Sequence, residues 1–339
     1  MDTEFALRCA AALLTAAAAT ELSIRYALRR QLLDLPGQRR SHRLPTPRGG
    51  GIAIVIAVLG CALPLLPLSL PFRWLLGVAV GAVAAVGWWD DHRPLSARAR
   101  LAIQAPAALL LAYLLLQLQM PAGLLVVAAL MVLVLLSTMW SINLHNFMDG
   151  INGLLTLQAS WMFALIAVLG ECGLPHGLGL APAAMAAACL GFLPFNFPRA
   201  RVFMGDVGSG ALGMLIAAVL WLAAWREPRW IAVGLLLGSS FFIDATATLL
   251  SRYWRGRRWY SAHREHLYQW LVRGGRSHAR VVGYYMAWNG LLIAPLSLVA
   301  ARNESLWPGL AAVVVAYVAG SVLWWRARLA VLAGARHRA

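Results

Sequence analysis

Long apolar runs recur from one end of this chain to the other and constrain its fold more than any other feature. Runs of this kind, close to the length that crosses about 30 Å of hydrocarbon, are typical of transmembrane helices. We therefore predict an all-α polytopic membrane protein with about 11 transmembrane helices, near residues 4–28, 52–70, 74–89, 101–118, 121–142, 154–170, 178–195, 208–225, 229–250, 281–300 and 305–325.

The composition supports a membrane protein. Of 339 residues, 61% are apolar and 12% are charged, with a mean hydropathy of +0.69, far from the averages for soluble domains. The first run lacks a basic region before it and a clear cleavage site, so we expect a retained span and not a signal peptide. No soluble domain fits between the runs. We predict a single integral membrane domain, 1–339, with active-site loops at about 29–51, 90–100, 143–153, 196–210 and 252–280.

The charged residues exclude several classes of chemistry. All 29 basic residues are arginine, so lysine Schiff-base or general-base catalysis is excluded. The net charge of +16 comes without a basic helix interleaved with aromatic residues and without zinc-finger spacing, so we expect no nucleic-acid partner. The cysteines are widely spaced and lack a CxxC pair, which disfavours a disulfide framework or a zinc site; they are Cys9, Cys61, Cys172 and Cys189.

The arginines also predict an orientation. They gather in alternate loops and in the C-terminal tail, whereas the opposite loops carry few. By the positive-inside rule the N-terminus is outside and the C-terminus is cytoplasmic. The polar segments between the apolar runs then all fall on the cytoplasmic side, which predicts one polar site assembled from distant loops.

Two of these polar segments precede or follow early spans. Residues 40–51 combine arginine, Ser41, His42 and Thr46 with three glycines that open a helix. This pattern suits phosphate binding, although a charged topology anchor would look similar. The second segment begins with Asp90 and Asp91, which could cap a helix, ligate a metal or act as a base toward a phosphate-bearing partner.

Three further segments carry oxygen donors or histidines. Asn143, Asn146 and Asp149 are spaced by three residues and share one face of a helical turn, as Mg²⁺ ligands would. Asp206 lies in a glycine-rich turn, where it is either a helix cap or a hard metal ligand beside an anion site. In 263–269 two histidines lie three apart, which fits a phosphate contact better than a zinc site.

The ordered set of motifs resembles the polyprenyl-phosphate N-acetylhexosamine-1-phosphate transferases. The resemblance covers about 39–269 and rests on Arg-Ser-His-Arg-x-Pro-Thr-Pro-Arg-Gly-Gly-Gly (40–51), the Asp90-Asp91 pair with Arg100, Leu101 and Gln104, Asn-Phe-Met-Asp-Gly-Ile-x-Gly (146–153), Val-Phe-Met-Gly-Asp-Val-Gly-Ser (202–209), Asp-Ala-Thr-x-Thr-Leu (244–249) and His-Arg-x-His-x-Tyr-Gln (263–269). Each motif is weak singly, whereas six in the family's order are specific.

The resemblance implies an enzyme that transfers a sugar-1-phosphate from a UDP-N-acetylhexosamine to undecaprenyl phosphate and releases UMP. It also implies a bacterial inner-membrane location, Mg²⁺ dependence with Mn²⁺ as a substitute, and the branch that starts O-antigen or related lipopolysaccharide synthesis. It implies catalytic roles for Asp90, Asp91 and Asp149, metal binding by Asp206, Asn146 and Asp149, and substrate binding by Ser41, His42, Arg43, Thr46, Arg48, Asn143, Asn146, Asn152, Arg201, His263, Arg264 and His266.

One departure from the bacterial pattern and several alternatives stay open. Asn152 stands where many bacterial relatives have Asp, which removes a negative charge but keeps an oxygen ligand. The sequence leaves open which sugar is transferred and whether the protein forms a homodimer. It also leaves open whether the lipid phosphate attacks directly or the reaction passes through a phospho-enzyme at Asp90 or Asp91. The alternative function is a nucleotide-sugar or lipid-linked-sugar transporter, which inverted repeats and polar residues at the middle of spans would favour.

Overall fold

The computed structural model describes residues 3–35, 45–170, 178–257 and 263–336. Within these residues the regular structure is helical apart from one antiparallel pair of two-residue strands, β1 (Leu33–Asp34) and β2 (Thr46–Pro47). The predicted all-α class is therefore confirmed. The helices are α1 (Thr3–Arg29), α2 (Ile52–Ala57), α3 (Leu70–His92), α4 (Ala97–Leu118), α5 (Leu124–Met148), α6 (Leu154–Gly170), α7 (Leu180–Asn196), α8 (Gly205–Arg226), α9 (Trp230–Leu237), α10 (Ser239–Trp254), α11 (Leu267–Arg273), α12 (His278–Trp288), α13 (Ala294–Arg302) and α14 (Leu306–Arg336).

Seven stretches of helix in the described part of the chain are long and apolar enough to cross a membrane. An eighth span is added when α9 and α10, which meet at a bend of 65°, are counted together. Three shorter apolar helices, Ile52–Leu65, Leu154–Gly170 and Leu180–Asn196, coincide with further predicted runs. Each of the eleven predicted runs thus overlaps helix, while the count of eleven crossings and the orientation of the termini stay predictions.

Helix α8 is the centre of the bundle. In its span 83% of the residues are buried, against 17% in α1 and α5. It packs chiefly against α3 and α5, and also against α2, α4 and α6. Small residues allow this close packing: a Cβ on Gly51 would lie 2.4 Å from the Cα of Gly208, so the segment before α2 touches α8 backbone to backbone.

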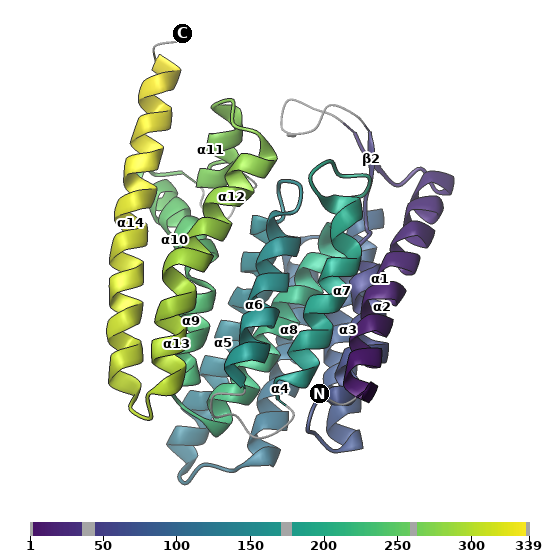
Figure 1. Ribbon diagram of the computed structural model, residues 1–339, viewed down its shortest axis with the longest axis vertical. Helices are drawn as coiled ribbons and strands as arrows, with labels where there is room; N and C mark the ends of the chain where they lie inside the picture. Colours follow the sequence, from purple (N-terminus) through teal and green to yellow (C-terminus); the bar gives the residue numbers. More distant parts are fainter. Residues whose placement is uncertain (1–2, 36–44, 171–177, 258–262, 337–339) are drawn as a thin grey trace.

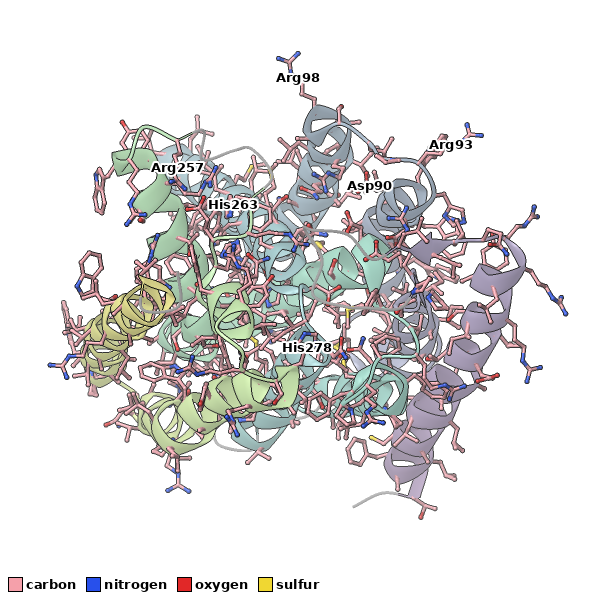
Figure 2. All side chains as sticks on the ribbon, turned by 90° about the horizontal axis from the view of Figure 1, so that it is seen from above. Asp90, Arg93, Arg98, Arg257, His263 and His278 are labelled. Atoms are coloured by element: carbon pink, nitrogen blue, oxygen red, sulfur yellow. The ribbon has the colours of Figure 1, made fainter. Side chains whose placement is uncertain are left out.

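The predicted polar segments meet at one end of the bundle. Figure 1 shows β2, α11 and the C-terminal end of α14 at this end, with α1 and α14 at opposite sides of the molecule. The backbone N–H of Phe203, just before α8, donates to the carbonyl of Pro47 in β2 at 2.8 Å. Figure 2 looks down on the same end, and its labelled side chains include Asp90 from one predicted segment and His263 and His278 from another.

Candidate active site

A polar cavity of about 280 Å³ lies where these segments meet. Its walls come from the strand pair, the end of α3, the turn between α5 and α6, the segment between α7 and α8, and the loop before α11. The lining residues are Asp34, Arg48, Asp91, Asp149, Gly150, Ile151, Asn152, Asn196, Phe203, Gly205, Asp206 and Arg264. The structure therefore brings predicted residues from all five polar segments to one cavity.

Asp91 caps the start of α8. Its carboxylate is 4% exposed, and its Oδ1 and Oδ2 accept hydrogen bonds from the backbone N–H groups of Asp206 (3.1 Å) and Val207 (3.2 Å). These N–H groups belong to the first helical turn, where backbone donors have no partner within the helix. A helix cap was one predicted role for this acid, and the cap acts on a helix far along the sequence.

The glycine-rich turn before α8 has a steric cause. Gly205 has a φ of +76°, and a Cβ at this position would lie 2.5 Å from Oδ2 of Asp91. A side chain here would be strained by the backbone and would displace the capping carboxylate. Glycine at this position therefore lets α3 and α8 meet through Asp91.

Asp90 and Asp206 share a counter-ion. Nη1 of Arg100 lies 3.2 Å from Oδ2 of Asp206 and 3.6 Å from Oδ2 of Asp90. Asp90 also accepts a hydrogen bond from the backbone N–H of Leu95, which fixes the turn between α3 and α4. Arg100 therefore links the end of α3 to the start of α8 through these two acids.

Asp149 adds a further carboxylate directly after α5. The backbone N–H of Gly205 donates to it, so the end of α5 is tied to the start of α8. Burial, and then the negative charge of Asp91, raise the pKa of Asp149 to about 7. Burial of the carboxyl group is the larger of these two causes, and the charge of Asp91 adds to it.

The carboxylates of this cavity fit a magnesium ion that is shared with a substrate. The described residues contain no preformed group of three or more His, Cys, Asp or Glu side chains that could hold a metal by themselves. Mg²⁺ at phosphate sites, however, is typically bound through one or two carboxylates together with substrate oxygens and water. Asp149 and Asp206 line the same cavity and supply such oxygens. Asn146 is not among the lining residues, but its side chain hydrogen-bonds Asp206, and its amide also donates to Oγ of Ser209 at 3.0 Å.

Cationic and amide groups complete the wall. Arg48 and Arg264 line the cavity, and the guanidinium of Arg48 donates to the backbone carbonyl of Asp91. Asn152 also lines it, and its side-chain amide donates to the carbonyl of Pro198 at 3.1 Å. Guanidinium groups beside carboxylates are the arrangement expected for a diphosphate held together with a cation.

Several predicted binding residues lie elsewhere in the structure. Arg201 is exposed and pairs with Glu21 of α1 at 3.2 Å, away from the cavity lining. Asn143 donates to Oε1 of Gln104 at 2.9 Å, and Thr46 is buried in β2. Ser41, His42 and Arg43 fall outside the described residues.

The two histidines of the last motif lie outside the cavity lining. The rings of His263 and His266 are 4.9 Å apart, and His266 stacks on Tyr268 at 5.8 Å. Neither is among the described residues that line the cavity, whereas Arg264 between them is. The substrate-binding roles of His263 and His266 stay predictions.

Two lining residues with polar side chains, Asp34 and Asn196, were not predicted from the sequence. Asp34 is one of 13 acids in the chain and lies directly before the basic segment, which could have drawn attention to it. Asn196 is 3% exposed; its Oδ1 accepts from the N–H of Gly153 (3.0 Å) and from Oγ1 of Thr156 (2.9 Å), while its amide donates to the carbonyl of Val202. It ties the turn after α5 to the segment before α8. A buried polar residue at the end of an apolar span was the available signal.

Comparison with known proteins shows the family of the chain. Residues 73–224 match the family model described as glycosyl transferase family 4. The chain is 31% identical over 324 residues to the decaprenyl-phosphate N-acetylglucosaminephosphotransferase of Mycobacterium tuberculosis, which covers 84% of this chain and 80% of the relative. The enzyme of the same name from Mycobacterium leprae is 30% identical over 301 residues, 78% of this chain and 76% of the relative.

A more distant relative comes from another bacterial group. The phospho-N-acetylmuramoyl-pentapeptide-transferase of Neisseria meningitidis serogroup C is 28% identical over 249 residues, 62% of this chain and 67% of the relative. The similarity to the mycobacterial enzymes extends over most of both chains. The chain belongs to the family of polyprenyl-phosphate N-acetylhexosamine-1-phosphate transferases.

Proposed function

We propose that this membrane protein transfers an N-acetylhexosamine-1-phosphate from a UDP-sugar to undecaprenyl phosphate and releases UMP. The observation that carries the proposal is one cavity lined by Asp91, Asp149, Asp206, Arg48 and Arg264, in a chain of this family. N-acetylglucosamine is the first sugar to test, because it appears in the names of the mycobacterial relatives. The predicted O-antigen branch finds no support in these relatives, and the transporter alternative is not favoured.

The cavity residues would have different roles in the proposed reaction. Arg48 and Arg264 would bind the donor diphosphate, since two phosphates can approach only when their charge is balanced. Asp149 and Asp206 would hold Mg²⁺, which when bound would neutralise negative charge on the phosphate oxygens. Asp91 would act by fixing the start of α8, because both of its oxygens already accept backbone hydrogen bonds. The same bonds favour direct attack by the lipid phosphate over a phospho-enzyme at Asp91.

An apolar cavity along α5 suits the lipid acceptor. It measures about 350 Å³ and is lined mainly by apolar side chains of α5, α8, α9 and α10. Helix α5 contributes Leu133, Trp140 and Leu144 to this cavity and ends directly before Asp149. A polyprenyl chain lying along α5 would therefore lead its phosphate toward the carboxylates. We place the reaction at the cytoplasmic face of the inner membrane, on the arginine distribution.

The test is release of labelled UMP by the purified protein from a panel of UDP-sugars, with undecaprenyl phosphate and Mg²⁺. Asp206→Asn removes a negative charge from the cavity, and we expect it to lower kcat at least about 100-fold. Glu227→Gln, an exposed acid paired with Arg229, is the matched control and should keep wild-type turnover. Failure of every donor to yield UMP, or wild-type turnover of Asp206→Asn across a Mg²⁺ titration, would contradict the proposal.

A further inference from the structure

Arg328 of α14 is buried without a hydrogen-bond partner among the residues that the structure describes. The residue is 3% exposed, and Nε, Nη1 and Nη2 all lack a partner. Its guanidinium lies 4.9 Å from the ring centre of Trp324, a contact that satisfies none of its N–H groups. Arginine keeps its charge in proteins, so it cannot relieve the burial by losing a proton. An ionised group in this state calls for an anion.

The nearby acids are already engaged. Oε1 of Glu265 pairs with both Arg252 and Arg257. Asp244 of α10 accepts from the N–H of Leu267 (2.7 Å) and from the Tyr285 hydroxyl (2.7 Å). It also accepts from Nε1 of Trp324 at 3.0 Å. Neither carboxylate contacts Arg328, although both lie close enough for their charge to act on it.

Positive charge exceeds negative charge around this group. Arg255 and Arg257, at and after the end of α10, also act on Arg328 through their charge. We call Arg252, Arg255, Arg257 and Arg328 the arginine site. Figure 2 shows Arg257 at the same end of the bundle as Asp90, but over α10 and not over α3. None of the four is among the described residues that line the carboxylate cavity, so this site is separate from the proposed active site.

We propose that the arginine site binds a phosphate-bearing anion, with Arg328 as its buried contact. Phosphate oxygens match the fork of guanidinium donors, and basic pockets between membrane helices bind lipid head groups. A phospholipid is one source and free phosphate is the other. The surroundings suit the lipid: Trp324 also lines a cavity of about 320 Å³ between α10, α12 and α14, whose other walls include Ile243, Trp288 and Leu323.

The test uses native mass spectrometry of the full-length protein with phosphatidylglycerol or phosphatidylcholine, and thermal unfolding with sodium phosphate against sodium chloride at equal ionic strength. The variant is Arg328→Gln, which keeps much of the side-chain length. Arg326→Gln, an exposed position on the same helix, is the matched control. We expect Arg328→Gln to bind phosphatidylglycerol about five- to ten-fold more weakly, while the control and all phosphatidylcholine binding stay unchanged.

The lipid measurement and the phosphate measurement together distinguish a phospholipid from free phosphate as the bound anion. Protection of the wild type by phosphatidylglycerol alone identifies a lipid head group, and equal protection by inorganic phosphate identifies a soluble anion. Arg328→Lys, which keeps the charge but loses the fork, should retain part of the preference. Equal binding and equal protection in the wild type, Arg328→Gln and Arg326→Gln would overturn the proposal. These measurements do not involve turnover, so they stand or fall independently of the proposed transfer reaction.

Discussion

Oδ1 of Asp91 accepts the backbone N–H of Asp206 at 3.1 Å, so the two acids of the cavity are joined through the first turn of α8. The arrangement gives them different tasks. Asp91 is buried and its oxygens hold backbone donors, whereas the Asp206 side chain is 30% exposed toward the cavity and Arg100. Two acids that look alike in sequence therefore lie in different environments, one holding backbone donors and the other facing the cavity.

The first prediction separates these tasks. Asp91→Asn leaves one acceptor oxygen where the carboxylate has two, so α8 loses a cap and the free energy of unfolding should fall by about 1–2 kcal/mol. Asp206→Asn removes only a partly exposed ion pair and should change stability by less than about 1 kcal/mol. Unfolding of both variants in the same detergent measures this. A larger loss in Asp206→Asn than in Asp91→Asn would contradict it.

The second prediction concerns the turn before α8. Gly205→Ala places a side chain at a φ of +76° and 2.5 Å from the Asp91 carboxylate, so it should cost about 1–2 kcal/mol from the backbone alone and should also displace the cap. Gly81→Ala in α3 meets no atom within 4 Å and should leave stability unchanged or raise it by up to about 1 kcal/mol. Thermal unfolding and UMP release of the two variants provide the comparison.

The sequence correctly predicted the features of the fold and site that depend on residues close together in the chain. Long apolar runs form helices wherever they occur, and acids, amides and glycines between them had to lie at helix ends, so Asp149 and Asp206 were correctly expected in one polar site. The partners of individual side chains could not be predicted. Arg201 pairs with Glu21, and Asn143 with Gln104, because segments far apart in the sequence pack side by side at these positions.

The number of membrane-spanning helices could not be predicted from the sequence either. Helices α6 and α7 have 17 residues each, and α9 meets α10 at a sharp bend, so length and hydropathy do not decide which of them cross the bilayer. A helix cap was among the predicted roles of Asp91, but the sequence could not show that the capped helix is α8. This pairing depends on how deeply α3 packs against α8, which is set by glycines on both helices.

The third prediction concerns pH. Burial, followed by the charges of His266 and Arg252, lowers the pKa of His263 from 6.5 to about 4. The folded state therefore binds fewer protons here than the unfolded state, so the contribution to stability is complete above about pH 6.5 and is lost as the pH falls toward about 4. His263→Gln should reduce the decline in unfolding temperature across this range. An unchanged decline would exclude His263 as its source.

The fourth prediction concerns orientation. The C-terminal end of α14 lies at the same end of the bundle as α11 and the strand pair (Figure 1), so the C-terminus and the carboxylate cavity share one side. A reporter fused after Arg338 should therefore read cytoplasmic, and one inserted near His176 should read external. The opposite result for the C-terminal fusion would place the cavity outside the cell and exclude a cytoplasmic UDP-sugar as its donor.

The last prediction concerns Tyr268 as a positioning residue for Asp149. Its side chain is fully buried, and its hydroxyl donates to the carbonyl of Phe147 at 2.9 Å and packs directly on Gly150, where a Cβ would lie 2.0 Å away. Tyr268→Phe removes the bond to Phe147 and loosens the turn that carries Asp149, at a cost of about 1–2 kcal/mol to stability. Because this turn must hold its geometry during the reaction, kcat should fall several-fold while KM for the UDP-sugar stays nearly constant. Tyr284→Phe, half exposed on α12, is the control and should behave as the wild type. A rise in KM with unchanged kcat would instead assign Tyr268 to donor binding.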